Sequence, residues 1–190
     1  FMHIEFQCAI GRSLDIITQV ETVHAFTRDL GSDYGAYTAG TAMLETAERI
    51  VADTEEPSVQ QYQLLVGALA ALTEHRQAPS VLMDSYQLRA LAIAGYAPSF
   101  DGCARCGSDE TCRYFHIASG GVLCDDCRVS GASVPGEATI ALLGALLAGD
   151  WDAVERSDER SRNAAGGIVA AYLSWHLERG LRSLIPVDRG

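Results

Sequence analysis

Two Cys-x-x-Cys pairs stand at the ends of one stretch of the chain, CARCGSDETCRYFHIASGGVLCDDC, which covers residues 103–127. The first pair is Cys103 and Cys106, the second is Cys124 and Cys127, and 17 residues separate them. Zinc sites commonly place two such turns about 15 to 20 residues apart, because each turn directs two sulfur atoms at one metal ion. The spacing therefore predicts that these four cysteines bind one Zn²⁺ ion.

The predicted zinc site is structural. Four thiolates fill every position around a tetrahedral ion, which leaves none for water or substrate. The free energy of metal binding is then folding free energy for a module at about residues 100–130, which is too small to have a core of its own. We expect the other two cysteines, Cys8 and Cys112, to be a small strand residue and a spare thiol.

Disulfide bonds are the alternative for these cysteines, and they require an oxidising compartment. The first six residues, FMHIEF, lack the basic start and apolar stretch of a secretion signal. The longest apolar runs, 64–72 and 141–149, reach about half of the roughly 18 to 20 residues needed to cross a bilayer. We therefore expect zinc in preference to disulfides, in a cytoplasmic protein without a membrane-spanning helix.

Most of the remaining chain has the hydrophobic spacing of helices. Apolar residues recur at intervals of three and four in residues 39–51, 62–72, 80–95, 140–148 and 161–184. Two short stretches rich in β-branched residues, 3–10 and 14–20, come first and predict two strands with a turn between them. The predicted fold class is mainly α: a helical bundle with an inserted four-cysteine zinc module, preceded by two strands.

The charge balance restricts how the protein could bind nucleic acid. Its 190 residues include 14 basic residues, all arginine, and 25 acidic residues, which gives a formal net charge of −11. A broad phosphate-binding surface is therefore excluded, and any contact with DNA must be local.

No catalytic motif stands out in the sequence. A phosphate loop, a dinucleotide fingerprint and a nucleophile elbow are all absent. His176-Leu177-Glu178 matches half of a base-deaminase zinc motif, but it follows the cysteines by about fifty residues and lies in a predicted helix. We expect His176 to be a hydrogen-bonded core residue and the protein not to be an enzyme.

Five segments resemble one known family. They are SLDIITQVE at 13–21, LETAER at 44–49, LRAL through AGYAP at 88–98, CARC at 103–106 and WHLER at 175–179. In their order and wording they resemble the RecO family of DNA repair proteins in its actinobacterial form, and the resemblance covers essentially the whole chain.

The resemblance implies a domain organisation. RecO-like proteins have an N-terminal OB-fold barrel, followed by a helical domain that carries a zinc module in many members. By this resemblance, residues 1–20 are the last strands of the barrel and residues 21–190 are the helical C-terminal domain. OB barrels bind single strands with a basic groove and stacking aromatic residues, so we expect most of the barrel, and with it the main DNA surface, to be missing from this chain.

The resemblance also implies a function in recombination after DNA damage. RecO-like proteins are recombination mediators that bind single- and double-stranded DNA and anneal complementary strands. With RecR they help to load RecA onto DNA covered by single-strand binding protein. The helical domain is expected to dock the acidic C-terminal tail of single-strand binding protein.

An acidic amphipathic peptide requires an apolar groove with a cation at its rim. The candidate cations are Arg76, Arg89, Arg179 and Arg182. Each of them is also compatible with a solvated helix face. A zinc-stabilised protein-interaction adaptor or regulator without direct DNA binding is the alternative function, and salt distinguishes the two, because only phosphate contacts weaken steeply with ionic strength.

Overall fold

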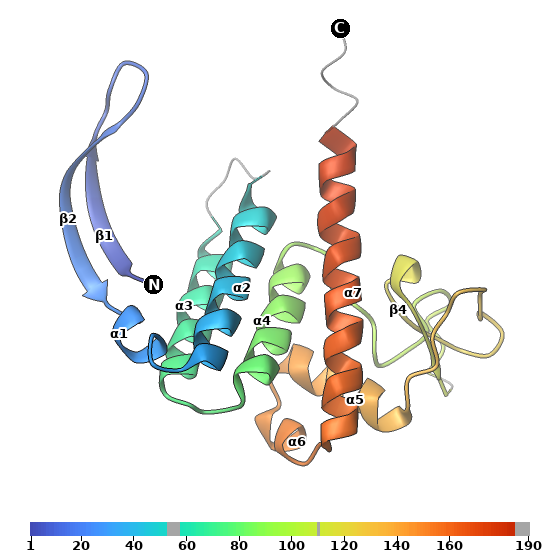
Figure 1. Cartoon of the computed structure of the whole chain (residues 1–190). Helices are drawn as coiled ribbons and strands as arrows, with labels where there is room; N and C mark the ends of the chain where they lie inside the picture. The colour runs from blue at the N-terminus through green and yellow to red at the C-terminus, as the bar shows by residue number, and fades with distance from the viewer. Residues whose placement is uncertain (53–57, 110, 185–190) are drawn as a thin grey trace, which may run out of the picture.

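The computed structural model describes residues 1–52, 58–109 and 111–184, with side chains up to residue 177. A β-hairpin, a helical bundle and a small cysteine-containing module follow one another across the molecule (Figure 1). The mainly α fold class is therefore confirmed. Among the described residues, none of the helices combines the length and hydropathy needed to span a membrane.

The hairpin consists of β1 (His3–Ala9) and β2 (Ile16–His24), which pair in antiparallel orientation. β2 ends four residues beyond the strand end expected at residue 20, because Thr22 still pairs with Ile4 and His24 with His3. The hairpin projects away from the helices (Figure 1), so apolar side chains on it are exposed. These side chains are Ile4, Phe6, Ile16, Ile17, Val20 and Val23.

Three helices follow the hairpin: α1 (Thr27–Leu30), α2 (Tyr34–Val51) and α3 (Val59–Thr73). The two longer ones begin at side-chain caps, which satisfy N–H groups that have no partner within the helix. Asp33 Oδ1 accepts a hydrogen bond from the N–H of Ala36 at 3.1 Å, and Ser58 Oγ accepts one from the N–H of Gln61 at 3.3 Å. Met43, Leu69 and Leu72 lie in the core that these helices share.

The central element is α4 (Pro79–Ile93), which packs against α2, α3, α5 and α7. Proline suits its first position, because the first N–H of a helix has no intrahelical partner. Two buried side-chain hydrogen bonds join it to neighbouring helices. Gln61 Nε2 of α3 donates to the carbonyl of Ala90 at 2.7 Å, and Ser85 Oγ of α4 donates to the carbonyl of Leu146 in α5 at 2.7 Å. The helix is buried on most sides, as its apolar sequence predicts.

The chain returns to helices after the cysteine module, with α5 (Glu137–Ala148), α6 (Trp151–Glu155) and α7 (Glu159–Leu184). Gly149 ends α5 in the left-handed conformation, with φ of 74°. Asp150 caps α6, and Asp158 Oδ1 accepts a hydrogen bond from the N–H of Ser161 in the first turn of α7. Leu143, Val154 and Val169 are fully buried where these helices meet α4.

Candidate functional site

A short hairpin brings the two Cys-x-x-Cys turns together. β3 (Tyr114–His116) pairs antiparallel with β4 (Gly121–Leu123), and the 3₁₀ turn η1 (Ile117–Ser119) connects them. The first turn is closed by the N–H of Gly107, which donates to the carbonyl of Cys103 at 2.8 Å. The N–H of Ala104 donates to the carbonyl of Val122 at 2.8 Å, which fixes this turn beside the strand that leads into the second.

Gly121 allows the chain entering the module to pass directly over β4. The N–H of Val122 donates to the carbonyl of Ser99, and the N–H of Ser99 donates to the carbonyl of Gly120, both at 2.9 Å. Gly121 has φ of 154°, and a Cβ atom there would lie 2.3 Å from the carbonyl oxygen of Ser99. Only glycine fits this close approach.

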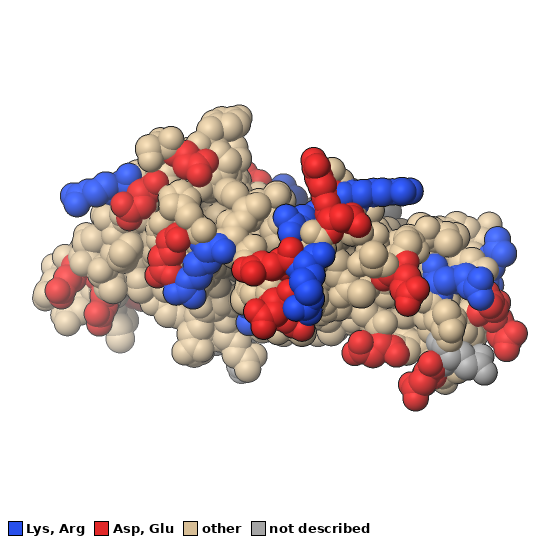
Figure 2. All heavy atoms as spheres, turned by 90° about the horizontal axis from the view of Figure 1, so that it is seen from below, with Lys and Arg blue, Asp and Glu red and all other residues tan. Residues whose placement is uncertain are grey.

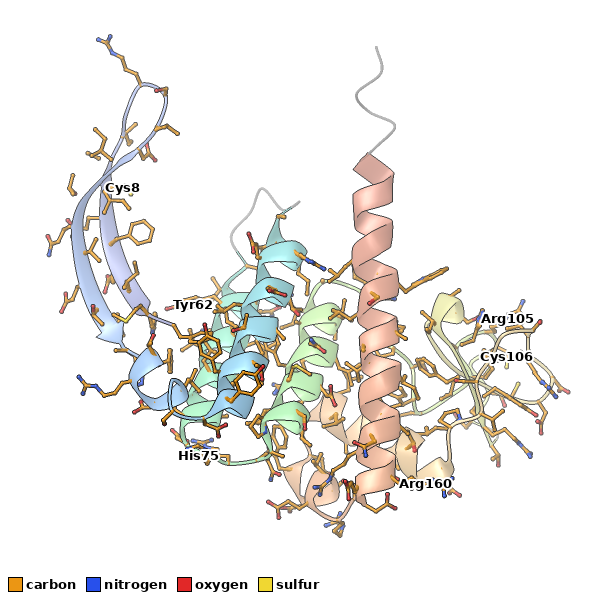
Figure 3. The ribbon with its side chains drawn as sticks, viewed as in Figure 1. Cys8, Tyr62, His75, Arg105, Cys106 and Arg160 are labelled. Atoms are coloured by element: carbon orange, nitrogen blue, oxygen red, sulfur yellow. The ribbon has the colours of Figure 1, made fainter. Side chains whose placement is uncertain are left out.

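The four paired cysteines form one cluster. The Sγ atoms of Cys103, Cys106, Cys124 and Cys127 all lie within 4.8 Å of one another, and those of Cys106 and Cys124 are 3.8 Å apart. Cys103 and Cys124 are buried, Cys127 is partly buried and Cys106 is exposed at the outer edge of the module (Figure 3).

This cluster fits a zinc ion in both chemistry and size. Zn–S bonds of about 2.3 Å in a tetrahedron place the sulfur atoms about 3.8 Å apart, which is the observed separation of Cys106 and Cys124. An all-thiolate tetrahedral set is typical of zinc or an iron–sulfur centre. Four cysteine ligands would fill every coordination position of such an ion, so a substrate or water molecule could not bind to it.

The thiols affect one another's ionisation. Backbone N–H groups of Cys124 and Cys106 lower the pKa of Cys103 to about 6. The neighbouring thiols of Cys106 and Cys124 raise the pKa of Cys127 to about 12. Four sulfurs this close therefore cannot all carry a negative charge at neutral pH unless a cation lies among them.

Arginines surround the cluster without forming a continuous basic surface. The guanidinium of Arg128 lies over the ring of Tyr114, 5.0 Å from its centroid, and Arg113 Nη2 forms an ion pair with Asp125 Oδ2 at 2.9 Å. Arg105 lies beside Cys106 at the outer edge of the module (Figure 3).

The other two cysteines have different surroundings. Cys8 is exposed on β1, at the opposite end of the molecule from Cys106 (Figure 3). Cys112 is partly buried and packs against Cys103 and Cys124. Burial and the charge on Cys103 raise the pKa of its thiol. Sequence reasoning did not place Cys112 beside the cluster, because the loop that carries it has no periodic pattern.

A second candidate site is a groove of about 760 Å³ between α3, α4 and α6. Its apolar lining includes Leu64, Leu82 and Trp151. Arg76, from the α3–α4 loop, and Arg89, from α4, both line it. The structure therefore brings two of the four arginines predicted from the sequence into one groove.

The two arginines differ in their surroundings. Arg76 is exposed and forms an ion pair with Glu74. Arg89 is half-buried, lies against Gly149 at the end of α5, and has no carboxylate partner within the described part of the chain. A half-buried guanidinium beside apolar side chains favours an anionic ligand with an apolar part.

The remaining residues singled out from the sequence are not among the described residues that line this groove. The side chains of Arg179 and Arg182 lie outside the described residues. His176 lies in the bundle, where its ring is 4.7 Å from that of Tyr96 and 4.4 Å from that of Tyr172, measured between ring centroids.

Comparisons with known proteins identify relatives of the whole chain. The family model described as "Recombination protein O C terminal" matches residues 31–185. A protein named DNA repair protein RecO from Nocardioides sp. is 55% identical over 192 residues, which cover 100% of this chain and 79% of the relative. Proteins of the same name from Thermobifida fusca and Streptomyces griseus are each 48% identical, again over 100% of this chain and over 78% and 79% of their own lengths.

Proposed function

Because the chain belongs to the RecO family of DNA repair proteins, we propose that it acts as a recombination mediator. It binds single- and double-stranded DNA and anneals complementary strands. With RecR it helps to load RecA onto DNA covered by single-strand binding protein. It works in the cytoplasm and catalyses no covalent reaction.

The observation that carries this proposal is the similarity along the entire chain. Relatives that are 48% to 55% identical over the whole of it are named DNA repair proteins. The four-cysteine cluster supports a structural ion, and the groove between α3, α4 and α6 offers apolar and cationic side chains to a partner.

Zn²⁺ is the ion we assign to Cys103, Cys106, Cys124 and Cys127. When bound, it supplies cross-links and charge neutralisation between the two turns. The protein's own contribution is the β3–β4 hairpin and the hydrogen bonds of Gly107 and Ala104, which bring the four sulfurs to one place.

The groove between α3, α4 and α6 is the proposed docking site for the acidic tail of single-strand binding protein. Trp151 and Leu64 supply apolar contact, and Arg89 supplies a cation without a carboxylate partner in the described chain. A peptide with aromatic or aliphatic side chains beside a carboxylate matches both features.

DNA requires a different surface. On the face seen in Figure 2, arginines alternate with aspartates and glutamates, so no field of one sign covers it. We propose that the hairpin of residues 3–24 is the last part of an OB-fold domain. Such a barrel would provide most of the contact with single strands.

Strand annealing tests the proposed function. Two complementary oligonucleotides, one carrying a fluorescence donor and the other an acceptor, are mixed with and without the protein, with and without single-strand binding protein as a coat. A mediator accelerates annealing of both naked and coated strands. If a protein that carries both this helical domain and a complete RecO-family barrel left the annealing rate unchanged, the proposal would be refuted.

Salt separates the mediator from the adaptor. Anisotropy titrations with labelled single-stranded DNA and with the labelled acidic tail peptide are run at about 50 and 200 mM salt. DNA affinity should fall steeply over this range, because binding to many phosphates releases many counterions. Peptide affinity should fall much less, because the peptide docks through apolar contacts and a single half-buried guanidinium. An adaptor without direct DNA binding would retain only the peptide interaction.

A further inference from the structure

Five of the six cysteines lie in or beside the metal centre, although only four can complete a tetrahedron. The fifth is Cys112. It packs against the buried cluster that contains Cys103 and Cys124, and also against the buried cluster that contains Phe115 and Tyr172. It therefore lies at the junction of the module and the bundle, and not on an open surface.

We propose that Cys112 is a reserve ligand of the metal centre, which takes the coordination position of Cys103 when that sulfur is lost. The proposal rests on the zinc site proposed above. It assigns to Cys112 a role that a spare thiol would not have.

Contact with Cys103 is the first argument. Cys112 packs against the buried cluster of Cys103, Leu123 and Cys124, so its thiol lies beside that coordination position. A cysteine thiolate would also restore the same all-sulfur set, whereas water in the vacant position would change the donor chemistry.

The backbone around Cys112 is the second argument. Residues 111–113 belong to no helix or strand, and β3 begins only at Tyr114. A shift of this segment toward the metal would break no ladder hydrogen bond between β3 and β4. The cost would fall on the packing of Cys112 against the buried cluster that contains Phe115 and Tyr172, so the module would keep its metal and loosen its junction with the bundle.

Position should matter for the replacement. Cys103 is a buried member of the cluster against which Cys112 packs, whereas Cys127 only borders that cluster. Cys112 should therefore replace Cys103 more effectively than it replaces Cys127. Cys8, on the distant hairpin, provides a matched control for the mere presence of another thiol.

The test compares zinc retention in the reduced full chain. The variants are Cys103→Ala, Cys103→Ala/Cys112→Ala, Cys103→Ala/Cys8→Ala, Cys127→Ala and Cys112→Ala. Each is dialysed against a moderate chelator and analysed for zinc per chain. The Co²⁺-substituted proteins are then compared by the intensity of their sulfur-to-metal charge-transfer absorption, which reports the number of thiolates.

We expect Cys103→Ala to retain close to one zinc ion and the absorption of four thiolates, with or without Cys8. Cys103→Ala/Cys112→Ala should bind zinc at least tenfold more weakly and lose one thiolate from the spectrum. Cys127→Ala should resemble that double variant. Cys112→Ala alone should keep four thiolates but release zinc to the chelator several-fold faster than the unchanged protein, because no thiol can refill a transiently vacant position.

Two results would overturn the reserve ligand. One is equal zinc loss, or equal failure to fold, in Cys103→Ala and in Cys103→Ala/Cys112→Ala. The other is unchanged zinc release in Cys112→Ala. If the unchanged protein itself bound no zinc, the proposed zinc site would fail, and that outcome is distinguishable from both.

Discussion

The Sγ atoms of Cys106 and Cys124 lie 3.8 Å apart, although 18 positions separate the two residues in the sequence. The β3–β4 hairpin closes this distance, and Cys124 follows directly after β4. The module is therefore ordered by two interdependent features, the backbone ladder and the sulfur cluster.

Backbone geometry at Gly121 should be essential for the module. Gly121→Ala forces a Cβ atom against the carbonyl of Ser99 at a φ unfavourable to other residues, so it should destabilise the protein by about 2 to 4 kcal/mol. It should also accelerate zinc release, because Cys124 lies three residues further on. Denaturant unfolding and chelator competition measure the two effects.

Gly167→Ala is the matched control for this substitution. Gly167 lies within α7, and no atom lies within 4 Å of a Cβ built there. Alanine should be neutral or stabilise the helix by about 0.5 to 1 kcal/mol. Equal stability of Gly121→Ala and Gly167→Ala would refute the close approach at Ser99.

Metal affinity should rise with pH. Neighbouring thiols raise the pKa of Cys127 to about 12, so at neutral pH the ion must displace its proton. Each displaced proton makes affinity about tenfold greater per pH unit. Competition with a chelator of known proton affinities, at pH 6.5 and 7.5, should give at least this tenfold increase, and pH-independent affinity would show that the thiols are already ionised.

Asp84 should make stability depend on pH in the opposite sense from most carboxylates. Burial raises its pKa from 3.8 to about 7. Its contribution to stability is therefore fully present below pH 3.8 and is lost as the pH rises through about 7. Asp84→Asn removes the charge. The free energy of unfolding of the variant, minus that of the unchanged protein, should therefore increase by about 2 to 3 kcal/mol from pH 5 to pH 8.

Asp158→Asn is the control for this pH effect. The N–H of Ser161 lowers the pKa of Asp158, so this carboxylate is ionised throughout the same range. Urea unfolding at pH 5 and pH 8 should show no pH-dependent difference for Asp158→Asn. A similar flat result for Asp84→Asn would mean that Asp84 is solvated in the folded protein.

Arg89 should dominate peptide docking in the groove. Arg89→Ala removes a half-buried cation without a carboxylate partner in the described chain, and should weaken binding of the acidic tail peptide about tenfold or more. Arg76→Ala should have a smaller effect, because Arg76 is exposed and paired with Glu74. Anisotropy with the labelled peptide measures both.

The control for Arg89 is Arg12→Ala, in the turn between β1 and β2. Its affinity for the peptide should match that of the unchanged protein. If Arg12→Ala and Arg89→Ala weakened binding equally, general attraction to positive charge would explain the docking and the groove would not.

The sequence was sufficient for the elements whose residues repeat or pair at fixed intervals. The Cys-x-x-Cys pattern predicted the sulfur cluster because each turn holds two sulfur atoms close together within four residues. A single hairpin, β3–β4, then brings the two turns to one place. The helical spacing predicted α2, α3, α4, α5 and α7 in the same way. In α6, five residues are too few to establish a helical period, and this helix was not predicted.

Relationships that depend on tertiary packing were beyond the sequence. Arg76 and Arg89 line one groove together with Trp151 of α6, and they come from separate parts of the chain. Cys112 contacts the cluster through an irregular loop whose path no periodicity specifies. The end of β2 was also missed, because strand length depends on pairing with β1 as well as on composition.

Metal analysis of the purified, reduced protein tests the central claim most directly. Native mass spectrometry and elemental analysis, after dialysis against metal-free buffer, should find one zinc ion per folded chain, held by the cluster that contains Cys103 and Cys124. A folded, monodisperse protein with reduced cysteines and no stoichiometric zinc would contradict it.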